Sequence, residues 1–277
     1  MNASKSPPPA RIAVGQLNPQ TGDVAGNLAR IEAIVRGAAD AGAALVVLPE
    51  TATTGYFISD RLGELAEDED GPTSRRLGAM AHDCGVHLAV GMPVVADGAF
   101  FDAQLLFAPD GQRLATYHKV HLFSLERSFY TPGNAPLVVE TALGRIGLTV
   151  CYDLIFSDYV RRLTELGADL IVNSTNWISN AWQREVWGWS GPVVQSLAGT
   201  RALENGVWLA MADCIGQEAD YVSLGHSCLV APSGRILASV GEGHGFAVAD
   251  MFHDGQDLAD WRALASYRAD RRPELYG

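Results

Sequence analysis

The sequence repeats a short pattern, and this repeat constrains the fold more than any other feature. Residues 42–50 read GAALVVLPE, and residues 167–175 read GADLIVNST. Each run follows an amphipathic stretch that ends near glycine and then becomes continuously apolar, which is typical of a helix that leads into a strand buried on both faces. A second pair, LFAPDGQRL at 106–114 and LVAPSGRIL at 229–237, has the turn chemistry of β-hairpins. The chain therefore contains two halves of similar design.

The elements expected around these repeats give both halves the order β-α-β-α-β-β. The first half has predicted strands at 11–17, 45–48 and 87–92, helices at 23–39 and 73–84, and a hairpin reaching residue 117. The second half has predicted strands at 145–151, 170–173 and 207–212, helices at 158–166 and 192–205, and its own hairpin. Two such halves predict an α/β fold, a four-layer α-β-β-α sandwich with two mixed sheets inside and helices outside. An ordinary doubly wound sheet is the alternative.

We expect a single domain over residues 11–277, preceded by a disordered tail at 1–10 that contains three consecutive prolines. The formal charge of −12 argues against non-specific binding of nucleic acid, because phosphates would be repelled. No apolar run reaches about 18 residues, so no membrane span is expected. The four cysteines show neither metal spacing nor a disulfide pattern, and a reducing cytoplasm is the expected compartment.

Three residues with complementary chemistry fall at the ends of predicted strands, where functional groups gather in α/β sheets. Glu50 ends the strand LVVLP, Cys151 ends GLTV, and Lys119 follows the hairpin strand. Taken singly, each has an ordinary interpretation: a buried small thiol, a helix cap or a surface charge. Together, the carboxylate could take the thiol proton, the thiolate could attack carbon, and the ammonium could stabilise the oxygen that becomes negative.

These segments resemble the nitrilase superfamily of carbon–nitrogen hydrolases, from about residue 11 to the end of the chain. The resemblance is carried by LPE at 48–50 with TGY at 54–56, YHKVHLF at 117–123 followed by Glu126, GLTVCYD at 147–153, the run 163–173, and RRPELY at 271–276. Each motif alone is weak, but all three catalytic motifs occur in order. The fold of this superfamily is an α-β-β-α sandwich, in agreement with the duplicated layout.

The resemblance implies a role for each matching residue. Glu50 would be the general base and Cys151 the nucleophile that forms a thioester, without a metal or an organic cofactor. Lys119 and the backbone N–H of Tyr152 would form the oxyanion hole. Glu126 would lie beside the substrate amide, where it could hold the leaving amine or position Lys119; a salt bridge to an arginine is its structural alternative. We also expect Lys119 to keep the pKa of Glu50 low.

Substrate contacts are suggested by position alone. Tyr56 follows the Glu50 motif, Asn173 ends a strand, and Trp177 begins a stretch to residue 189 that holds four of the six tryptophans. These rings could form an aromatic rim over the pocket, or they could pack in a subunit interface. Where many relatives have Pro-Glu after the Cys-Tyr-Asp motif, this chain has Ser157-Asp158, and either residue would make a good helix cap.

Cys-Tyr-Asp looks more like the amidase-like branch than like true nitrilases, so we predict hydrolysis of a small linear carboxamide. Hydrolysis of an N-carbamoyl compound or a nitrile is the enzymatic alternative. A non-catalytic binding protein that keeps the fold is an alternative of another class, and a dyad of Cys151 with His121 or His118 is an alternative mechanism. The C-terminal segment 267–276, with Arg268, Arg271 and Arg272, resembles tails that cross dimer interfaces, which predicts a homodimer or a larger even assembly. A solvated tail, which its charge favours, is the alternative.

Overall fold

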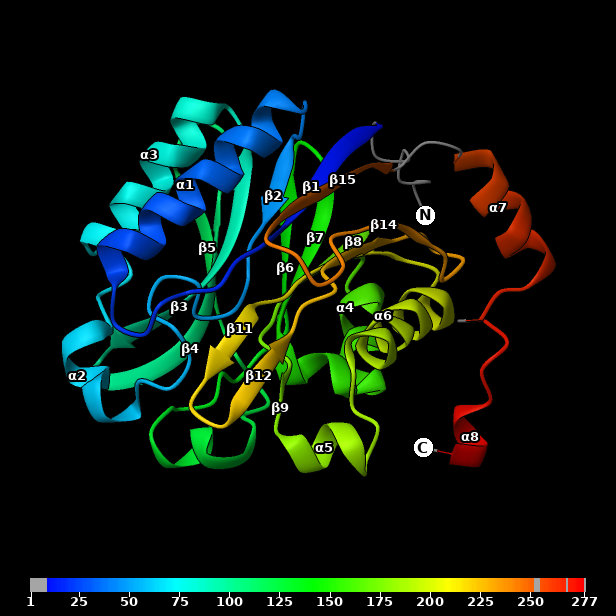
Figure 1. Ribbon diagram of the computed structural model, residues 1–277. Coiled ribbons are helices and arrows are strands. Elements are labelled where there is room, and N and C mark those ends of the chain that lie inside the picture. Colours follow the sequence, from blue (N-terminus) through cyan, green and yellow to red (C-terminus); the bar gives the residue numbers. More distant parts are fainter. Residues whose placement is uncertain (1–8, 252–254, 268, 277) are drawn as a thin grey trace.

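The computed structural model describes residues 9–251, 255–267 and 269–276 of the chain. Two six-stranded sheets lie face to face at its centre (Figure 1). The first sheet has the order β15-β1-β2-β3-β4-β5, and its strands are β1 (Ala10–Gln16), β2 (Leu45–Val47), β3 (His87–Ala96), β4 (Ala99–Phe107), β5 (Arg113–His118) and β15 (Gly245–Met251). The second has the order β14-β13-β10-β8-β7-β6, and its strands are β6 (Leu137–Thr141), β7 (Gly144–Val150), β8 (Leu170–Ser174), β10 (Trp208–Ala212), β13 (Cys228–Val230) and β14 (Ile236–Ser239).

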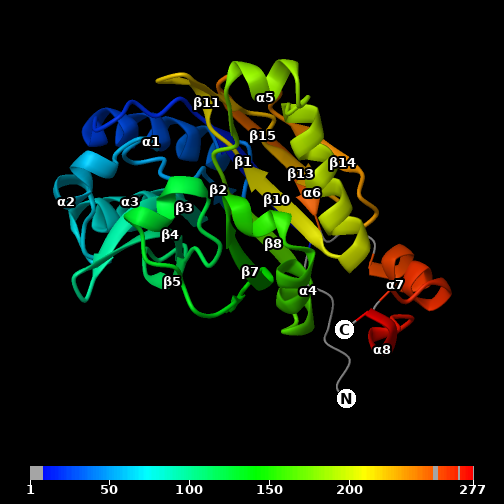
Figure 2. The ribbon, with the colours of Figure 1, turned by 90° about the horizontal axis from the view of Figure 1, so that it is seen from below.

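Helices cover the outer face of each sheet, as both views show (Figures 1 and 2). Helices α1 (Val24–Asp40) and α3 (Pro72–Cys84) pack on the first sheet, and α4 (Ser157–Glu165) and α6 (Gly191–Asn205) pack on the second. Helix α1 turns Ile31 and Val35 inward at helical spacing, and both side chains are fully buried. Helix α3 ends at Gly85, whose φ of 64° suits a glycine after the last turn.

Strands buried on both faces divide the core into two layers. Val46 and Leu88 pack with the helices outside the first sheet, whereas Val47 and Leu45 pack with Leu148 across the sheet–sheet interface. Successive side chains of a strand point to opposite faces, so a strand in this position needs a continuous apolar run. The apolar runs of the sequence therefore have the environment that was expected of them.

The predicted α-β-β-α sandwich is confirmed, and both hairpins form at the predicted turns. In the first, the N–H of Ala108 donates to the carbonyl oxygen of Gln112, and in the second the N–H of Ala231 donates to that of Arg235. Strands β6 and β15 were not predicted, and neither was a small sheet of β9 (Ile178–Ser179), β11 (Ile215–Glu218) and β12 (Tyr221–Leu224). Strand β15 returns from the second half to pair antiparallel with β1, so the two halves share a sheet.

Short elements complete the chain. They are the 3₁₀ helices η1 (Ser59–Arg61), η2 (Ser124–Ser128) and η3 (Cys151–Ile155), and the helices α2 (Leu62–Leu65), α5 (Ala181–Glu185), α7 (Gly255–Leu264) and α8 (Pro273–Tyr276). The predicted N-terminal tail lies mostly outside the described residues, and Ala10 already belongs to β1. Arg268 also lies outside them, while Arg271 of the C-terminal segment contacts Glu165 of α4 at 3.8 Å. Within the described ranges, no helix is both long and apolar enough to cross a membrane.

Candidate active site

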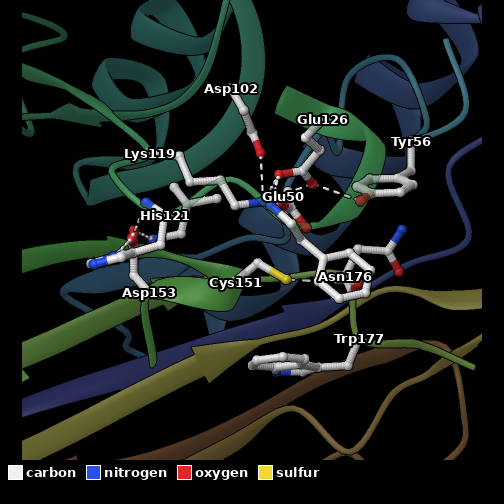
Figure 3. Close-up of polar contacts among 12 residues, drawn as sticks. Glu50, Tyr56, Asp102, Lys119, His121, Glu126, Cys151, Asp153, Asn176 and Trp177 are labelled. Carbon is white, nitrogen blue, oxygen red and sulfur yellow. Dashed lines mark hydrogen bonds and ion pairs between the residues drawn. The ribbon is translucent and has the colours of Figure 1, made fainter. Parts of the chain in front are cut away.

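The strand ends bring Glu50, Lys119 and Cys151 into one buried cluster (Figure 3). Glu50 follows β2, Lys119 follows β5, and Cys151 follows β7 at the start of η3. Glu50 and Lys119 are fully buried, and Cys151 is 6% exposed. The ammonium of Lys119 donates to Glu50 Oε1 at 2.6 Å. Their burial removes competing water, so each charge acts more strongly on its neighbours than it would at the surface.

Lys119 donates to three carboxylates at once. Besides Glu50, its Nζ lies 3.0 Å from Asp102 Oδ2 and 2.9 Å from the carboxylate of Glu126. The three acids are close enough together to hold a cation, and the Lys119 ammonium occupies that place. Since an ammonium has three N–H groups, all of its donors are committed in this arrangement.

Asp102 is a member of this cluster that the sequence reasoning missed. It lies on β4 in the run AFFDAQLLF, where it is 1% exposed and follows two phenylalanines. A carboxylate inside an apolar strand is costly unless it is paired, and this mismatch is the signal that could have identified it.

Both oxygens of Glu126 accept hydrogen bonds, one from a distant segment and one from the residue that precedes η2. The hydroxyl of Tyr56 donates to Oε1 at 2.6 Å, and the backbone N–H of Phe123 donates to Oε2 at 2.7 Å. Glu126 thus bonds to Lys119 and not to an arginine among the described residues, and it holds the ammonium together with Glu50 and Asp102 (Figure 3). Tyr56, expected as a substrate contact, reaches the site through this carboxylate.

A tight turn after β2 places Glu50. The N–H of Gly91 on β3 donates to the carbonyl oxygen of Pro49 at 3.0 Å, and the N–H of Ala52 donates to that of Gly91 at 3.0 Å. A Cβ at Gly91 would lie only 2.5 Å from the Cα of Glu50, so glycine is required for this close approach. Thr51 then adopts a left-handed φ of 45°, which turns the chain away sharply.

Cys151 lies at an equally sharp strand-to-helix turn, with a left-handed φ of 43°. Asp153 holds this turn, because its carboxylate accepts from the N–H of Val150 at 3.0 Å and from the hydroxyl of Tyr117 at 2.7 Å. The thiol donates to the carbonyl oxygen of Asn176 at 3.8 Å, a long contact that leaves it able to react. Strained backbone at a nucleophile is characteristic of enzymes that expose the reactive atom at a turn.

Burial sets the protonation states in the cluster. Burial raises the pKa of Glu50 well above its ordinary value, and the charges of Asp102 and Glu126 raise it further, so the opposing effect of Lys119 is outweighed. The expectation that Lys119 keeps this pKa low is therefore wrong. Burial, followed by the charge of Glu50, also raises the pKa of the Cys151 thiol. Burial alone would lower the pKa of Lys119, but the surrounding carboxylates raise it well above its usual range. The resting site thus holds a neutral thiol beside a permanent ammonium.

A cavity of about 200 Å³ opens beside the Cys151 thiol. Its wall is mainly aromatic, and the rings that line it are Tyr56, Phe123, Tyr152, Trp177, Trp187 and Trp189. The backbone N–H of Trp177 donates to the buried Asp213 at 2.9 Å, and its ring meets that of Trp189 edge-on with centroids 5.7 Å apart. Three of the four clustered tryptophans therefore form the expected rim, whereas Trp182 lies outside the lining and is 58% exposed.

Nearly the whole sequence matches one protein family. The carbon-nitrogen hydrolase family pattern matches residues 11–263, which is nearly all of the sequence. The chain belongs to the carbon–nitrogen hydrolase family. Among curated relatives, this hydrolase is 36% identical to a hydrolase from Pseudomonas protegens over 96% of the chain and 90% of the relative. It is 31% identical to an omega-amidase from Xenopus tropicalis, over 90% of the chain and 91% of that protein.

Solved structures agree with this assignment. An amidase of the nitrilase superfamily from Nesterenkonia, solved as a mutant at a cysteine, superposes with a TM-score of 0.83 at 28% identity and covers 100% of this chain and 98% of its own. Another structure of that amidase, with a TM-score of 0.82, 29% identity and coverage of 96% and 95%, shows covalent addition at its active-site cysteine. This hydrolase is therefore an enzyme of the amidase-like branch of the nitrilase superfamily.

In this hydrolase, one predicted substrate contact does not line the cavity, and the two predicted cap residues do not cap their helix. Asn173 is fully buried in β8, where its amide donates to the hydroxyl of Thr149 at 3.0 Å, and it does not line the cavity. Neither Ser157 nor Asp158 caps α4, because its N-cap is Phe156 without a side-chain bond, and Asp158 pairs with Arg161 instead. Position in the sequence identified these residues, but the direction of each side chain depends on the fold.

The two histidines are also engaged away from the thiol. His121 Nδ1 lies 2.8 Å from Asp153 Oδ1, and its ring stacks on Phe156 with centroids 3.9 Å apart. His118 Nε2 lies 3.2 Å from Glu69 Oε1. In the part of the chain that the structure describes, neither ring is hydrogen-bonded to Cys151, whose thiol donates to Asn176. The charge of Glu50, in contrast, contributes to the raised pKa of the thiol, so Glu50 is the better candidate for the base.

Proposed function

We propose that this enzyme hydrolyses a small linear carboxamide to a carboxylate and ammonia, through a thioester on Cys151. The observation that carries the proposal is the buried contact of Glu50 with Lys119 near a neutral thiol that lines a cavity of about 200 Å³. The omega-amidase and amidase relatives support it, as do structures of the Nesterenkonia amidase with acrylamide and butyramide. Expected substrates are therefore neutral amides of similar size.

In the first step, Glu50 removes the thiol proton as Cys151 attacks the amide carbon. Glu50 Oε2 is buried and has no hydrogen-bond partner among the described residues, so it is free to accept this proton. The raised pKa of Glu50 makes its carboxylate a stronger base than usual, and the raised pKa of Cys151 makes the base necessary. A tetrahedral intermediate forms, and the carbonyl oxygen becomes an oxyanion.

Lys119 stabilises this oxyanion by exchanging a partner. Its three donors are committed to Glu50, Asp102 and Glu126 in the resting site. When Glu50 takes the thiol proton, it loses its charge and its bond to the ammonium weakens. One N–H of Lys119 can then turn to the oxyanion, while Asp102 and Glu126 keep the ammonium in place. The backbone N–H of Tyr152 supplies the second donor.

Collapse of the intermediate breaks the carbon–nitrogen bond. Glu50 returns its proton to the leaving nitrogen, ammonia departs, and the acyl group remains on Cys151 as a thioester. Water then enters, Glu50 removes a proton from it, and the hydroxide attacks the thioester carbon. The Cys151 thiolate leaves and recovers the proton from Glu50, which restores the resting site.

Ammonia release and mass spectrometry test this proposal. We expect neutral aliphatic amides to yield ammonia without carbon dioxide, and to leave an acyl adduct on the intact protein during turnover. Cys151→Ala should form no adduct, whereas Cys84→Ala, at the half-buried thiol that ends α3, should behave like the parent enzyme. An adduct that persists in Cys151→Ala contradicts the nucleophile assignment. Faster ammonia release from N-carbamoyl compounds or nitriles than from amides would assign the enzyme to one of those classes.

Two further parts of the proposal concern the setting of the enzyme. We propose a cytoplasmic location, supported by four free cysteines, of which Cys151, Cys214 and Cys228 are buried. We also propose a homodimer or a larger even assembly, which sedimentation measurements would test.

A further inference from the structure

We infer that the cavity beside Cys151 selects amides with a neutral, apolar acyl group and rejects acyl groups that carry a carboxylate a few bonds from the reacting carbon. This inference rests on the proposed function and deepens it, because it names the acyl group that the same site accepts. Ammonia is the only leaving group, so the acyl group alone has to fill the cavity.

The cavity wall offers no charged partner. Of the described residues that line it, six are aromatic and two, Ile155 and Ile178, are aliphatic. The remaining side chains are Cys151 and the neutral amides Asn176 and Gln183. A carboxylate brought among these groups would lose its hydration without gaining an ion pair, and burial of an unpaired charge is strongly unfavourable. An apolar acyl group instead gains from contact with the rings.

The cluster behind the thiol adds to this discrimination. Three acids, Glu50, Asp102 and Glu126, surround a single ammonium, and Lys119 has no further donor for a fourth carboxylate. Arg127 lines a separate groove, and Tyr152 lines both that groove and the cavity. The Nε of Arg127 donates to the carbonyl oxygen of Leu122 at 3.2 Å. A distal carboxylate inside the cavity would thus find no cation in the described wall, and the Lys119 ammonium already pairs with three acids.

The size of the cavity limits the rejected class to short acyl chains. Its volume of about 200 Å³ is below the roughly 300–1,000 Å³ of pockets for drug-sized ligands. Trp187 lines the cavity and is nevertheless 72% exposed, so it marks the mouth. A carboxylate on a short chain stays inside this mouth, whereas one on a longer chain can pass Trp187 and remain hydrated. The penalty should therefore fall as the chain lengthens.

Three nearly isosteric amides test the inference. In 4-methylpentanamide the distal group is an isopropyl group, in succinamide a neutral amide, and in succinamate a carboxylate. We expect kcat/KM to decrease in that order, with succinamate slower than 4-methylpentanamide by about a hundredfold or more, as for an unpaired charge. For monoamides of dicarboxylic acids with longer chains, kcat/KM should approach that of neutral amides of the same length.

A variant that adds a positive charge to the cavity wall tests whether the wall causes the discrimination against carboxylates. Gln183 lies on α5, lines the cavity and accepts the N–H of Asn180 through Oε1 at 2.8 Å. Gln183→Arg should raise the ratio of succinamate to 4-methylpentanamide turnover at least about tenfold relative to Gln183→Met, which loses the same bond without adding charge.

The outcomes separate this inference from the proposed function. If none of the amides releases ammonia or acylates Cys151, the proposed function itself fails. If all three are hydrolysed and succinamate is as fast as 4-methylpentanamide or faster, only the inference on the acyl group is overturned. An equal ratio in Gln183→Arg and Gln183→Met would likewise overturn it, because the discrimination would not come from the charge of the wall.

Discussion

Replacing Glu50 by glutamine removes the base while keeping the shape of the site. The carboxamide oxygen of the new side chain can accept the Lys119 bond that Glu50 Oε1 now accepts at 2.6 Å. Its NH₂ group then takes the place of Oε2, which has no hydrogen-bond partner among the described residues. Asp102 and Glu126 still hold the ammonium, so the variant should fold. What it loses is the acceptor for the thiol proton.

The expected magnitude follows from the state of the thiol. At pH 7, an ordinary cysteine with a pKa of about 8.5 is only about 3% thiolate. Burial raises the pKa of Cys151, so its thiolate fraction is smaller still and reaction without a base is slow. General base catalysis contributes about 10²–10⁴-fold, and we expect Glu50→Gln to lower the acylation rate by this factor. This corresponds to about 2.7–5.4 kcal/mol of activation free energy.

Rapid-quench mass spectrometry of the acyl adduct measures this step directly, with circular dichroism and Tm as controls for folding. His121→Ala is the informative comparison, because His121 bonds to Asp153 and not to the thiol in the described structure. It should keep its acylation rate within about tenfold of the parent. If Glu50→Gln acylates normally while His121→Ala does not, a histidine is the base and the argument from the Glu50–Lys119 contact is refuted.

Three further predictions concern charge and pH. Burial raises the pKa of Glu50, so the acid limb of the kcat/KM profile should lie above the ordinary 4.5; a limb at or below 4.5 would contradict this. Lys119→Met should lose activity and about 3–5 kcal/mol of unfolding free energy, measured in urea at pH 7. The loss should be smaller at pH 5, because the carboxyl groups can then take protons. An unchanged unfolding free energy at pH 7 would argue against the buried ion cluster. Burial also raises the pKa of Asp213, so its stabilising contribution is complete below its unfolded pKa and is lost as pH rises through its folded pKa. Asp213→Asn should therefore lose less unfolding free energy than the parent between pH 4 and pH 8. Equal changes of unfolding free energy with pH in the two proteins would contradict the raised pKa.

Much of the architecture is determined locally. A run such as 45–48 is apolar on both faces, which favours a strand buried between two layers, and its repetition near 170 indicates a second half of the same design. The strand order of the structure then decides between one doubly wound sheet and two packed sheets. Local turn chemistry likewise determines both hairpins, because Pro-Asp-Gly and Pro-Ser-Gly bend the chain without distant contacts. Glu50, Lys119 and Cys151 could be identified because strand ends are where side chains leave the sheet.

The features that the sequence did not predict depend on contacts between segments far apart in the chain. Asp102 became a third ligand of Lys119 only through the pairing of β4 with β5, and β15 found its place only by returning to β1. The pKa of Glu50 was predicted with the wrong sign, because spacing shows a neighbouring cation but neither the burial nor the number of acids that share it. Asn173 shows the same limit, since a residue at a strand end can point into the sheet as readily as into a cavity. Sequence periodicity determines which face is apolar, whereas solvation and charge balance exist only after the layers have packed.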